Sequence, residues 1–371
     1  MALPSSGPLT FADIQTEFGG TNPIGLNEYY AGGAFVGEGT SGTYGAVPSS
    51  GTISVQNFYG TTASIPRGFV AGGRATNFLN VYTCAISYWA FASTGNSSSF
   101  GNLSYGRSEL GACGAVSRIV FCGGLTTGSG DSDVNTMDYI NPMTTGTATT
   151  FGEMFNNIGG GSAGGGNTTR GIWFGGEQAG GGAAVTTIAF ITYATTGNGS
   201  SFGSSGAAVY YNTCFSSPTR TIGGPGYYAG NPGNVIQYVT TATTGNALSF
   251  GSNSFLSAEP KGASSSTRGI LGSGYNSTAG GNTSILNYIT IATTGNTASF
   301  GFLPAVTRAT NSCSSNTYAV WASGSINNVD APTTNMQYVT IATLSNSSTW
   351  GTLSTAVYSG TGASNCSGAV Q

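Results

Sequence analysis

Five of the nine basic residues in this chain occupy one register of a repeated pattern, and Tyr318 stands at the sixth equivalent position. The five are Arg67, Arg118, Arg170, Arg220 and Arg268. If the copies form a ring, the guanidinium groups lie on one face, where they could bind a carboxylated or sulfated glycan. The alternative, which we favour, is structural, because a guanidinium can donate several hydrogen bonds to carbonyl groups of the neighbouring copy.

Four of the six cysteines share a second register, Cys113, Cys214, Cys313 and Cys366, while Cys84 and Cys122 lie elsewhere. Equivalent positions of a ring point in equivalent directions, so the spacing favours small buried side chains over disulfide partners. The sequence contains no C-x-x-C pair, so we expect no zinc site. All six thiols are expected to be reduced.

The chain contains no histidine. Ser-His-Asp and Cys-His catalysis and imidazole metal sites are therefore excluded. The stretch Asp131-Ser-Asp133-Val-Asn135 resembles the start of a calcium loop, but Thr136 stands where that loop needs glycine and Pro142 where it needs glutamate. We expect a solvated loop there and no metal site.

A glycosidase would need two carboxyl groups that face one cleft. We find no register shared by the eight acids of the repeated region, and so expect no catalytic residues, no cofactor and no enzyme activity. The acids are Glu109, Asp131, Asp133, Asp138, Glu153, Glu177, Glu259 and Asp330.

The charge and hydropathy of the chain limit the classes of partner that it could bind. Only 6% of the residues are charged, and the formal net charge is −3. No clustered basic surface of the kind that binds nucleic acid is indicated, and no apolar run approaches the roughly 18–20 residues of a membrane span. The start Met1-Ala2-Leu3-Pro4 lacks the basic and apolar regions of a signal peptide, so we expect synthesis in a cytoplasm.

The elements that would position these residues come from a sixfold repeat. An aromatic residue is followed twelve positions later by an aromatic-Gly pair, and successive pairs lie 51, 51, 48, 50 and 50 residues apart. The first aromatics are Tyr88, Tyr139, Phe190, Tyr238, Tyr288 and Tyr338. The pairs begin at Phe100, Phe151, Phe202, Phe250, Phe300 and Trp350. A period near fifty is typical of kelch-like propeller repeats.

Each copy reads as four short strands. The first is apolar and ends in a glycine, as in residues 170–176, which suggests a positive φ or a close backbone approach there. After a variable loop comes an alternating strand such as 285–291, then a tight Gly-Asn turn and the strand of the aromatic-Gly pair. A strand of small residues such as 111–117 ends the copy, and we expect it to be innermost.

The two ends of the repeat differ in phase. The chain enters at the Arg67 strand without a small-residue strand before it, and leaves at a small-residue strand, 360–370, with no further strand after it. We expect this last strand to be the inner strand of the unit that begins at Arg67, which would remove exposed sheet edges. The sequence thus predicts an all-β fold, with a closed six-bladed kelch-like β-propeller over residues 65–371.

Residues 1–64 are expected to form a small, mostly irregular module with short helices. Thr10 begins a T-x-x-D capping pattern for a helix ended by Gly19, and Ser54 could cap a shorter one ended by Gly60. The segment is too small for a large core of its own, so we expect its apolar side chains to attach it to another surface. These are Phe11, Ile14, Phe18, Tyr29, Tyr30, Phe58 and Tyr59.

Two stretches carry a family resemblance. The segment P-S-S-G-P-L-T-F-A-D-I-Q-T-E-F-G-G-T-N-P-I-G-L-N-E-Y-Y-A-G-G resembles the N-terminal module of many structural proteins of tailed phages, especially cyanophages. The units built on Y-I-T-I-A-T-T-G-N-T-A-S-F-G and R-G-I-x-x-G-G resemble the kelch-like repeats of the same proteins. In copies four to six the first glycine is replaced and Tyr318 stands for Arg, so these copies depart from the pattern.

The resemblance implies a virion protein made in the host cytoplasm and present in many copies per particle. Its N-terminal module would bind other virion proteins, and the propeller would bind host surface glycan without catalysis, as a tail-fibre or host-recognition adhesin. The alternative is a purely architectural component such as a head decoration, tail or baseplate protein. Neither reading includes a nucleic acid or a membrane as partner.

Overall fold

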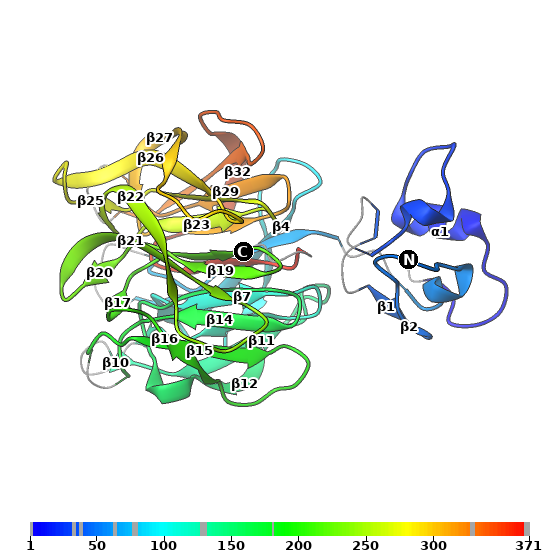
Figure 1. Ribbon diagram of the computed structural model, residues 1–371, viewed down its shortest axis with the longest axis horizontal. Coiled ribbons are helices and arrows are strands. Elements are labelled where there is room, and N and C mark those ends of the chain that lie inside the picture. Colours follow the sequence, from blue (N-terminus) through cyan, green and yellow to red (C-terminus); the bar gives the residue numbers. More distant parts are fainter. Residues whose placement is uncertain are drawn as a thin grey trace.

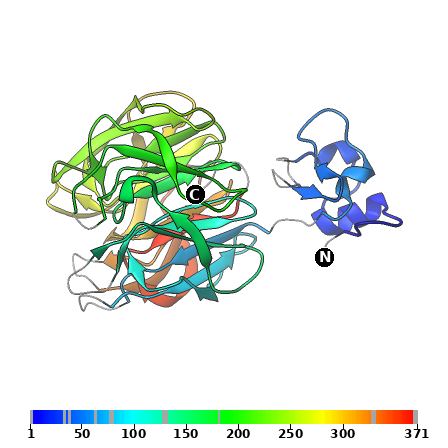
Figure 2. The same ribbon diagram turned by 90° about the horizontal axis from the view of Figure 1, so that it is seen from below.

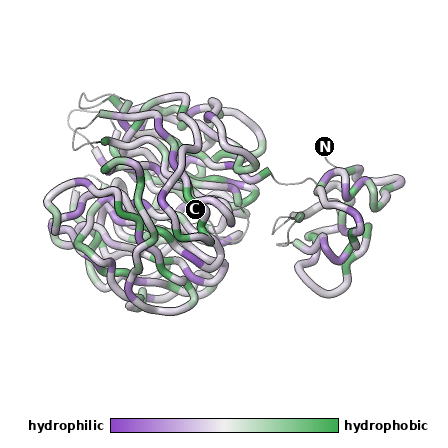
Figure 3. The backbone as a smooth tube through the Cα atoms, turned by 90° about the horizontal axis from the view of Figure 1, so that it is seen from above, coloured by the Kyte–Doolittle hydropathy of each residue, from purple (hydrophilic) through white to green (hydrophobic). Residues whose placement is uncertain are grey.

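The computed structural model describes residues 3–31, 35–36, 40–61, 65–75, 81–126, 132–179, 182–326 and 331–366. Within these residues the chain is all-β, apart from the helix α1 (Phe11–Phe18) and the 3₁₀ turns η1 (Leu26–Glu28), η2 (Val55–Phe58) and η3 (Phe155–Asn157). This confirms the all-β character that the sequence predicts. Figure 1 shows a large β-rich body, residues 65–366, beside a small N-terminal unit. Figure 3 shows short apolar and polar stretches interspersed along a mostly pale tube, as expected of a chain with 6% charged residues.

The β-rich body contains six units of four antiparallel strands. Unit 1 is β33 (Thr361–Ser364), β3 (Arg67–Ala71), β4 (Ala85–Ala90) and β5 (Ser98–Asn102). Unit 2 is β7 (Gly111–Gly114), β8 (Ile119–Cys122), β11 (Thr136–Ile140) and β12 (Thr149–Glu153), and unit 3 is β13 (Ala163–Gly166), β14 (Arg170–Phe174), β15 (Thr187–Thr192) and β16 (Ser200–Ser204). Unit 4 is β18 (Cys214–Ser216), β19 (Arg220–Gly223), β21 (Asn231–Thr240) and β22 (Leu248–Ala258). Unit 5 is β23 (Lys261–Ser264), β24 (Arg268–Gly272), β26 (Gly281–Thr290) and β27 (Ala298–Arg308), and unit 6 is β28 (Asn311–Ser314), β29 (Tyr318–Ala322), β31 (Thr333–Thr340) and β32 (Ser348–Val357).

The first-named strand of each unit is the predicted small-residue strand, which we call the edge strand. The predicted pairing of the C-terminal strand with the Arg67 strand is present: Gly68 lies opposite Ser364, and Ala71 opposite Thr361. Residues 367–371, which the prediction partly included, lie outside the described residues. Successive edge strands lie side by side in chain order from β7 to β33, and β33 lies beside β7. Among the described residues, however, no hydrogen-bonded sheet closes on itself, so the sheets themselves are open.

Short strands tie each unit to the segment that leads into it. These strands are β6 (Arg107–Ser108), β9 (Leu125–Thr126), β10 (Ser132–Asp133), β17 (Val209–Tyr210), β20 (Tyr227–Tyr228), β25 (Tyr275–Asn276) and β30 (Ser325–Ile326). Strand β6 pairs with β9, β17 with β20, β22 with β25 and β27 with β30, while the bridges Ile158–Gln178 and Arg74–Tyr358 serve units 3 and 1. Strand β10 pairs with β9. Because the pairings lie after the second strand of every unit, they fasten the loop-bearing ends of the six units.

The glycine of each aromatic-Gly pair is required by the next unit. A Cβ atom on Gly251 would overlap the carbonyl oxygen of Gly295, which lies in the Gly-Asn turn of unit 5. That turn is held there by hydrogen bonds from the Gly295 N–H to the Phe250 carbonyl (2.8 Å) and from the Ser252 N–H to Asn296 Oδ1 (3.0 Å). The same overlap occurs at the other five pairs, Gly101 with Gly146, Gly152 with Gly197, Gly203 with Gly245, Gly301 with Ser345 and Gly351 with Gly95.

The glycine that ends the apolar strand also fits its prediction. Gly176 has φ 108°, a left-handed value that favours glycine. At Gly226 the reason is space instead, because a Cβ atom would come within 2.7 Å of the Tyr210 carbonyl oxygen.

The N-terminal unit, residues 3–61, lies to one side of the β-rich body in both Figure 1 and Figure 2. Thr10 caps α1 in a capping box with Asp13, and Gly19 ends the helix with φ 84°, as predicted. Ser54 precedes η2, as predicted, and Gly60 follows it. A hairpin of β1 (Ser41–Gly42) and β2 (Gly45–Ala46) completes the unit. The boundary that we placed after residue 64 falls at residues 62–64, outside the described part of the chain.

The expectation that this unit cannot bury its own apolar side chains is wrong. Ile14, Tyr29 and Phe58 are fully buried and Phe18 is 6% exposed, all within one cluster that contains only residues of the unit. The cluster forms because the rings pack edge to face, Phe11 on Tyr29 and Phe18 on Phe58, with centroids 5.6 and 5.8 Å apart. Of the seven residues assigned to attachment, Phe11, Tyr30 and Tyr59 are therefore the ones that remain partly exposed.

We predict that Gly251→Ala destabilises the protein by about 1–3 kcal/mol or more, because the added methyl group meets a backbone oxygen that a turn holds in place. The control is Gly295→Ala, whose Cβ atom would meet no other group within 4 Å. Thermal melting should show a clear loss for the first variant and little change for the second. Equal melting temperatures would contradict the close-approach explanation.

Candidate functional site

A set of six left-handed residues marks one end of the units. Two or three residues before each edge strand stands a residue with φ between 47° and 65°. They are Glu109, Gly161, Tyr211, Glu259, Ala309 and Ser359, which we call the rim. Five of the six are not glycine, and such residues adopt this conformation only where surrounding contacts enforce it.

Backbone hydrogen bonds between rim residues supply those contacts. The N–H of Gly161 donates to the Glu109 carbonyl (2.9 Å), that of Tyr211 to Gly161 (2.7 Å) and that of Glu259 to Tyr211 (2.9 Å). The N–H of Ser359 donates to Ala309 (2.8 Å), and the N–H of Glu109 to Ser359 (2.6 Å). The last bond joins the segment that follows unit 1 to the segment that follows unit 6, so the rim links residues that are far apart in the sequence.

Two adjoining cavities open at the rim. A narrow one of about 30 Å³ is lined by the beginnings of the edge strands of all six units, among them Gly111, Gly164, Cys214, Gly262 and Gly362. A wider one of about 100 Å³ is lined by the rim residues Glu109, Tyr211 and Glu259, together with Ser162, Asn212 and Lys261. We call the second the rim cavity. Lys261 is the single lysine of the chain.

The charged groups of the rim cavity face one another. Glu109 Oε1 accepts a hydrogen bond from Arg74 Nη2 at 3.0 Å, and Glu109 Oε2 accepts one from the Tyr211 hydroxyl. Burial raises the pKa of Glu109, although Tyr211 and Arg74 oppose the shift. Burial also lowers the pKa of Lys261, against the attraction of Glu259 and Glu109. The cavity thus holds carboxylates and an amine in a partly desolvated setting.

Two further acids and a group of tyrosines lie beside the rim. Asp133 Oδ1 accepts a hydrogen bond from the Gly160 N–H at 2.7 Å. Burial raises the pKa of Glu177 to about 7, and the negative charges of Asp133 and Glu109 add to the shift. The rings of Tyr210 and Tyr227 stack with centroids 5.3 Å apart. The ring centroid of Tyr211 lies 5.0 Å from that of Tyr210.

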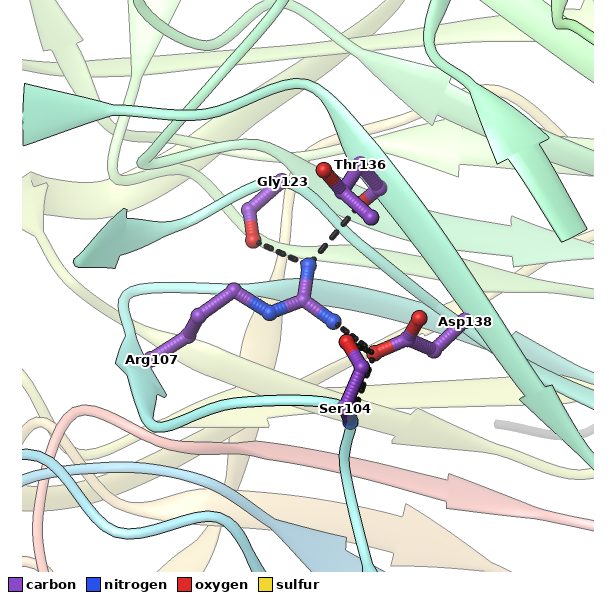
Figure 4. A network of polar contacts seen from close by, with 5 residues as sticks. All are labelled: Ser104, Arg107, Gly123, Thr136 and Asp138. Carbon is purple, nitrogen blue, oxygen red and sulfur yellow. Dashed lines mark hydrogen bonds and ion pairs between the residues drawn. The ribbon is translucent and has the colours of Figure 1, made fainter. Parts of the chain in front are cut away.

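A buried ion pair fixes the segment that carries Glu109. Figure 4 shows Arg107 donating from Nη2 to Asp138 Oδ2 (2.6 Å), and from Nη1 to the carbonyls of Gly123 (2.9 Å) and Thr136 (2.8 Å). The hydroxyl of Ser104 donates to the same carboxylate oxygen at 2.7 Å. Both charged side chains are completely buried, so removing one would leave an unpaired buried charge at a cost of about 3–5 kcal/mol. The pair thereby holds β6 against β11, two residues from the rim.

The sequence analysis missed this pair, although a signal was present. Asp138 directly precedes Tyr139, and Gln237 and Asn287 hold the equivalent places in units 4 and 5. All three polar side chains are buried. A polar residue recurring at one place on an otherwise apolar strand predicts a buried polar contact.

The expectation that no two acids share a register is wrong. Glu109 and Glu259 each follow the aromatic of their aromatic-Gly pair by nine residues, and both line the rim cavity. The shared position was not predicted because it is measured from the aromatic-Gly pair of one copy. The two glutamates, however, lie in the segment that leads into the next unit.

The five register arginines lie at the other end of the units from the rim. Each begins, or directly precedes, the second strand, whose opposite end leads to the glycine pair. Each donates from Nη1 to a carbonyl of the following unit, Arg67 to Pro142 (2.7 Å), Arg118 to Tyr193 (2.6 Å), Arg170 to Ala242 (2.7 Å), Arg220 to Ala292 (2.8 Å) and Arg268 to Ala342 (2.9 Å). Each guanidinium also lies 4.6–5.1 Å from the centre of the register aromatic of its own unit. These contacts join neighbouring units.

The cysteines and the calcium-like stretch are the remaining candidates from the sequence. All six cysteines are free, and all except Cys84 are buried. Asp131, the first residue of the calcium-like stretch, lies outside the described residues, as does Asp330. In the described part of the chain, no group of three or more His, Cys, Asp or Glu side chains could hold a metal ion. No helix among the described residues is long and apolar enough to cross a membrane.

Comparison with protein-family models and with curated proteins found no match to this chain.

Glu177 gives the body a predictable pH dependence. Because its pKa is raised from 4.5 to about 7 in the folded state, the folded protein binds this proton more tightly than the unfolded chain does. The ionised carboxylate therefore lowers stability above pH 7, and this penalty disappears as the pH falls toward 4.5. We predict that Glu177→Gln raises the melting temperature by a few degrees at pH 8 and leaves it nearly unchanged at pH 4.

The effect should be modest because Glu177 is only about half-buried and solvent screens its charge. Glu153→Gln removes another carboxylate, an exposed one on β12, and serves as the control for the change in net charge. Melting curves of the three proteins between pH 4 and pH 9 make the comparison. Parallel pH profiles for wild type and Glu177→Gln would contradict the assigned shift.

Proposed function

We propose that residues 65–371 form a closed six-bladed β-propeller, in which the six units are the blades. Three observations support this. The edge strands follow one another side by side and β33 lies beside β7. The narrow cavity is lined by all six edge strands. The rim bond from Glu109 to Ser359 and the Arg74–Tyr358 bridge join the end of the chain to its beginning.

The contact between units 6 and 1 repeats the contacts made elsewhere. A Cβ atom on Gly351 would overlap the Gly95 carbonyl oxygen, and the Thr352 N–H donates to Asn96 Oδ1 at 3.0 Å. One contact differs: the hydrogen bond from the register arginine to the following unit, which we call the arginine clamp, is replaced. Tyr318 packs on Trp350 in unit 6, and Trp350 packs on Phe91 of unit 1, with ring centroids 5.6 and 5.8 Å apart.

Closure makes a quantitative prediction. If the junction of units 6 and 1 is equivalent to the others, Gly351→Ala should lower the melting temperature about as much as Gly251→Ala does. Gly95→Ala, whose added Cβ atom would meet no other group within 4 Å, should be nearly neutral. A Gly351→Ala protein as stable as wild type would mean that the ring is open at this junction.

We further propose that the protein is a bacteriophage virion component, made in the host cytoplasm, that binds host surface glycan without catalysis. The observation that carries the proposal is the polarity of the body. The chain arrives from the N-terminal unit at Arg67, the start of β3, while the far end of β3 leads to the loops and the rim cavity. A particle that holds the N-terminal unit would therefore present the loops outward.

The loop face has the chemistry of a weak polar binding surface. The loops proposed to vary, 125–134, 177–184 and 275–283, follow the glycines at this end, although residues 127–131 and 180–181 lie outside the described part. These loops are rich in glycine, serine and threonine and contain one aromatic residue, Tyr275. Hydroxyl groups bind sugars by hydrogen bonding, and an aromatic ring binds them by stacking. Each site would be weak, so useful adhesion would require many copies per particle.

Catalysis is not proposed, despite the two carboxyl groups at one cavity. Both oxygens of Glu109 already accept hydrogen bonds, from Arg74 and from Tyr211. A general acid must donate a proton, whereas the ion pair with Arg74 favours the ionised form of Glu109. We therefore assign this carboxylate to joining the rim segments and to hydrogen bonding.

Attachment to the particle is assigned to the outer surface of the N-terminal unit. Tyr44 is 56% exposed and packs edge to face on Tyr59, which is partly exposed. Aromatic side chains of this kind are enriched at protein interfaces. Because the unit's buried cluster contains no residue of the body, deleting residues 1–61 should leave a folded body.

We predict that the deletion protein is folded but absent from purified virions, and that the full-length chain displayed in many copies adheres to susceptible host cells but not to resistant ones. The displayed chain should release no sugar from the host envelope. Tyr44→Ala is the matched point variant and should reduce incorporation without lowering the melting temperature.

Two outcomes would overturn this reading. Normal incorporation of the deletion protein would reject the N-terminal unit as the attachment module. Equal adherence to susceptible and resistant cells would favour the architectural alternative, in which the protein is a head decoration, tail or baseplate component.

A further inference from the structure

Two buried polar atoms at the rim cavity have no hydrogen-bond partner among the residues that the structure describes. The Ser162 hydroxyl and the Asn212 side-chain carbonyl make no hydrogen bond, although the residues are only 5% and 2% exposed. Asn212 is held in place by its Nδ2, which donates to the Phe174 carbonyl at 3.2 Å. Leaving buried polar groups unpaired is costly, so the cavity favours an occupant that can hydrogen-bond to them.

The rest of the lining limits the charge of that occupant. The carboxylates of Glu109 and Glu259 and the ammonium of Lys261 share one cavity. The ammonium disfavours a metal cation and the carboxylates disfavour an anion. A neutral molecule with several hydroxyl groups suits both, because each hydroxyl can donate to an oxygen and accept from the amine.

Size and shape narrow the class further. The cavity offers about 100 Å³, whereas a single water needs roughly 10–15 Å³ on the same measure. It can therefore take one small ring but not an oligosaccharide. Tyr211 lines the cavity and packs on Tyr210 and Tyr227, so one aromatic ring is available for the apolar side of a sugar ring.

We propose that the rim cavity binds one uncharged sugar residue at the free end of a glycan, held by Ser162, Asn212, Lys261 and the two glutamates. The inference rests on the proposed function, and it places glycan recognition at the rim cavity instead of at the loops. The recognition site becomes the rim cavity itself, which is lined by the rim residues and by the residues that follow them.

The single lysine provides a direct readout. Full-length protein labelled with ¹³C and ¹⁵N only in lysine gives the side-chain signals of Lys261 and no other. We would titrate it with glucose, galactose, mannose, rhamnose and N-acetylglucosamine, and in parallel with glucuronate and with calcium chloride. At least one neutral sugar should shift the Lys261 signals in a saturable way, with millimolar affinity, and the charged probes should not.

Matched variants test the assignment of the cavity. Ser162→Ala removes an unpaired hydroxyl, so it should leave the fold intact and weaken sugar binding about threefold to tenfold, the value of one hydrogen bond. Ser347→Ala is the control, because its hydroxyl is also buried and unpaired but does not line the cavity. It should bind as wild type does.

The outcomes separate this inference from the proposed function. If no neutral sugar shifts Lys261 while the displayed chain still adheres only to susceptible cells, the cavity assignment fails and the adhesin proposal stands. If a sugar shifts Lys261 but adherence does not distinguish the cells, the site stands and the adhesin proposal fails. A saturable response to calcium or glucuronate alone, or equal weakening by both serine variants, would also overturn the cavity assignment.

Discussion

The close approach of each tight turn to the aromatic-Gly pair of the preceding unit is the contact on which the β-rich body depends. It leaves no room for a side chain at the glycine of the pair. In every unit except the second, which has Thr147 in the turn, a turn asparagine also accepts a hydrogen bond from the backbone beyond the pair, as Asn296 does from Ser252. A unit of four short strands cannot bury both of its faces alone. The contact fixes how far each unit stands from the next, and the apolar strands then fill the space between them.

The register arginines and the register aromatics stabilise the same interfaces, because the arginines donate to carbonyl groups at the start of these turns. A guanidinium that lies over the ring of its own unit and donates to a carbonyl of the next unit couples the packing of one to the position of the other. At the sixth junction Tyr318 and Trp350 replace this polar clamp with ring contacts. The replacement indicates that the junction needs a large side chain bridging the gap, whereas its charge can vary.

The sequence predicted what is repeated and local. The α1 cap at Thr10, the four strands per unit and the pairing of the C-terminal strand all follow from patterns of a few residues. Prediction from the sequence failed where a feature depends on a contact between segments that are far apart in the chain. Nothing near Phe18 reveals that Phe58 will cover it, and the nearness of Glu109 to Tyr211 depends on two connectors from different units. The candidate cavity was missed for the same reason, because its lining comes from six separate segments.

The rim explains how the body can keep its architecture while the side chains at this end change. Its six residues are placed by backbone hydrogen bonds and a left-handed φ, and neither depends on which side chain is present. This chain uses two glutamates, a tyrosine, a glycine, an alanine and a serine there. Because the structural work is done by the main chain, side chains at the rim can be exchanged with little cost beyond the strain they already bear. The interfaces between units lack this freedom, since their glycines are fixed by close packing. Sequence variation should therefore concentrate at the rim and its loops, on the face turned away from the N-terminal unit.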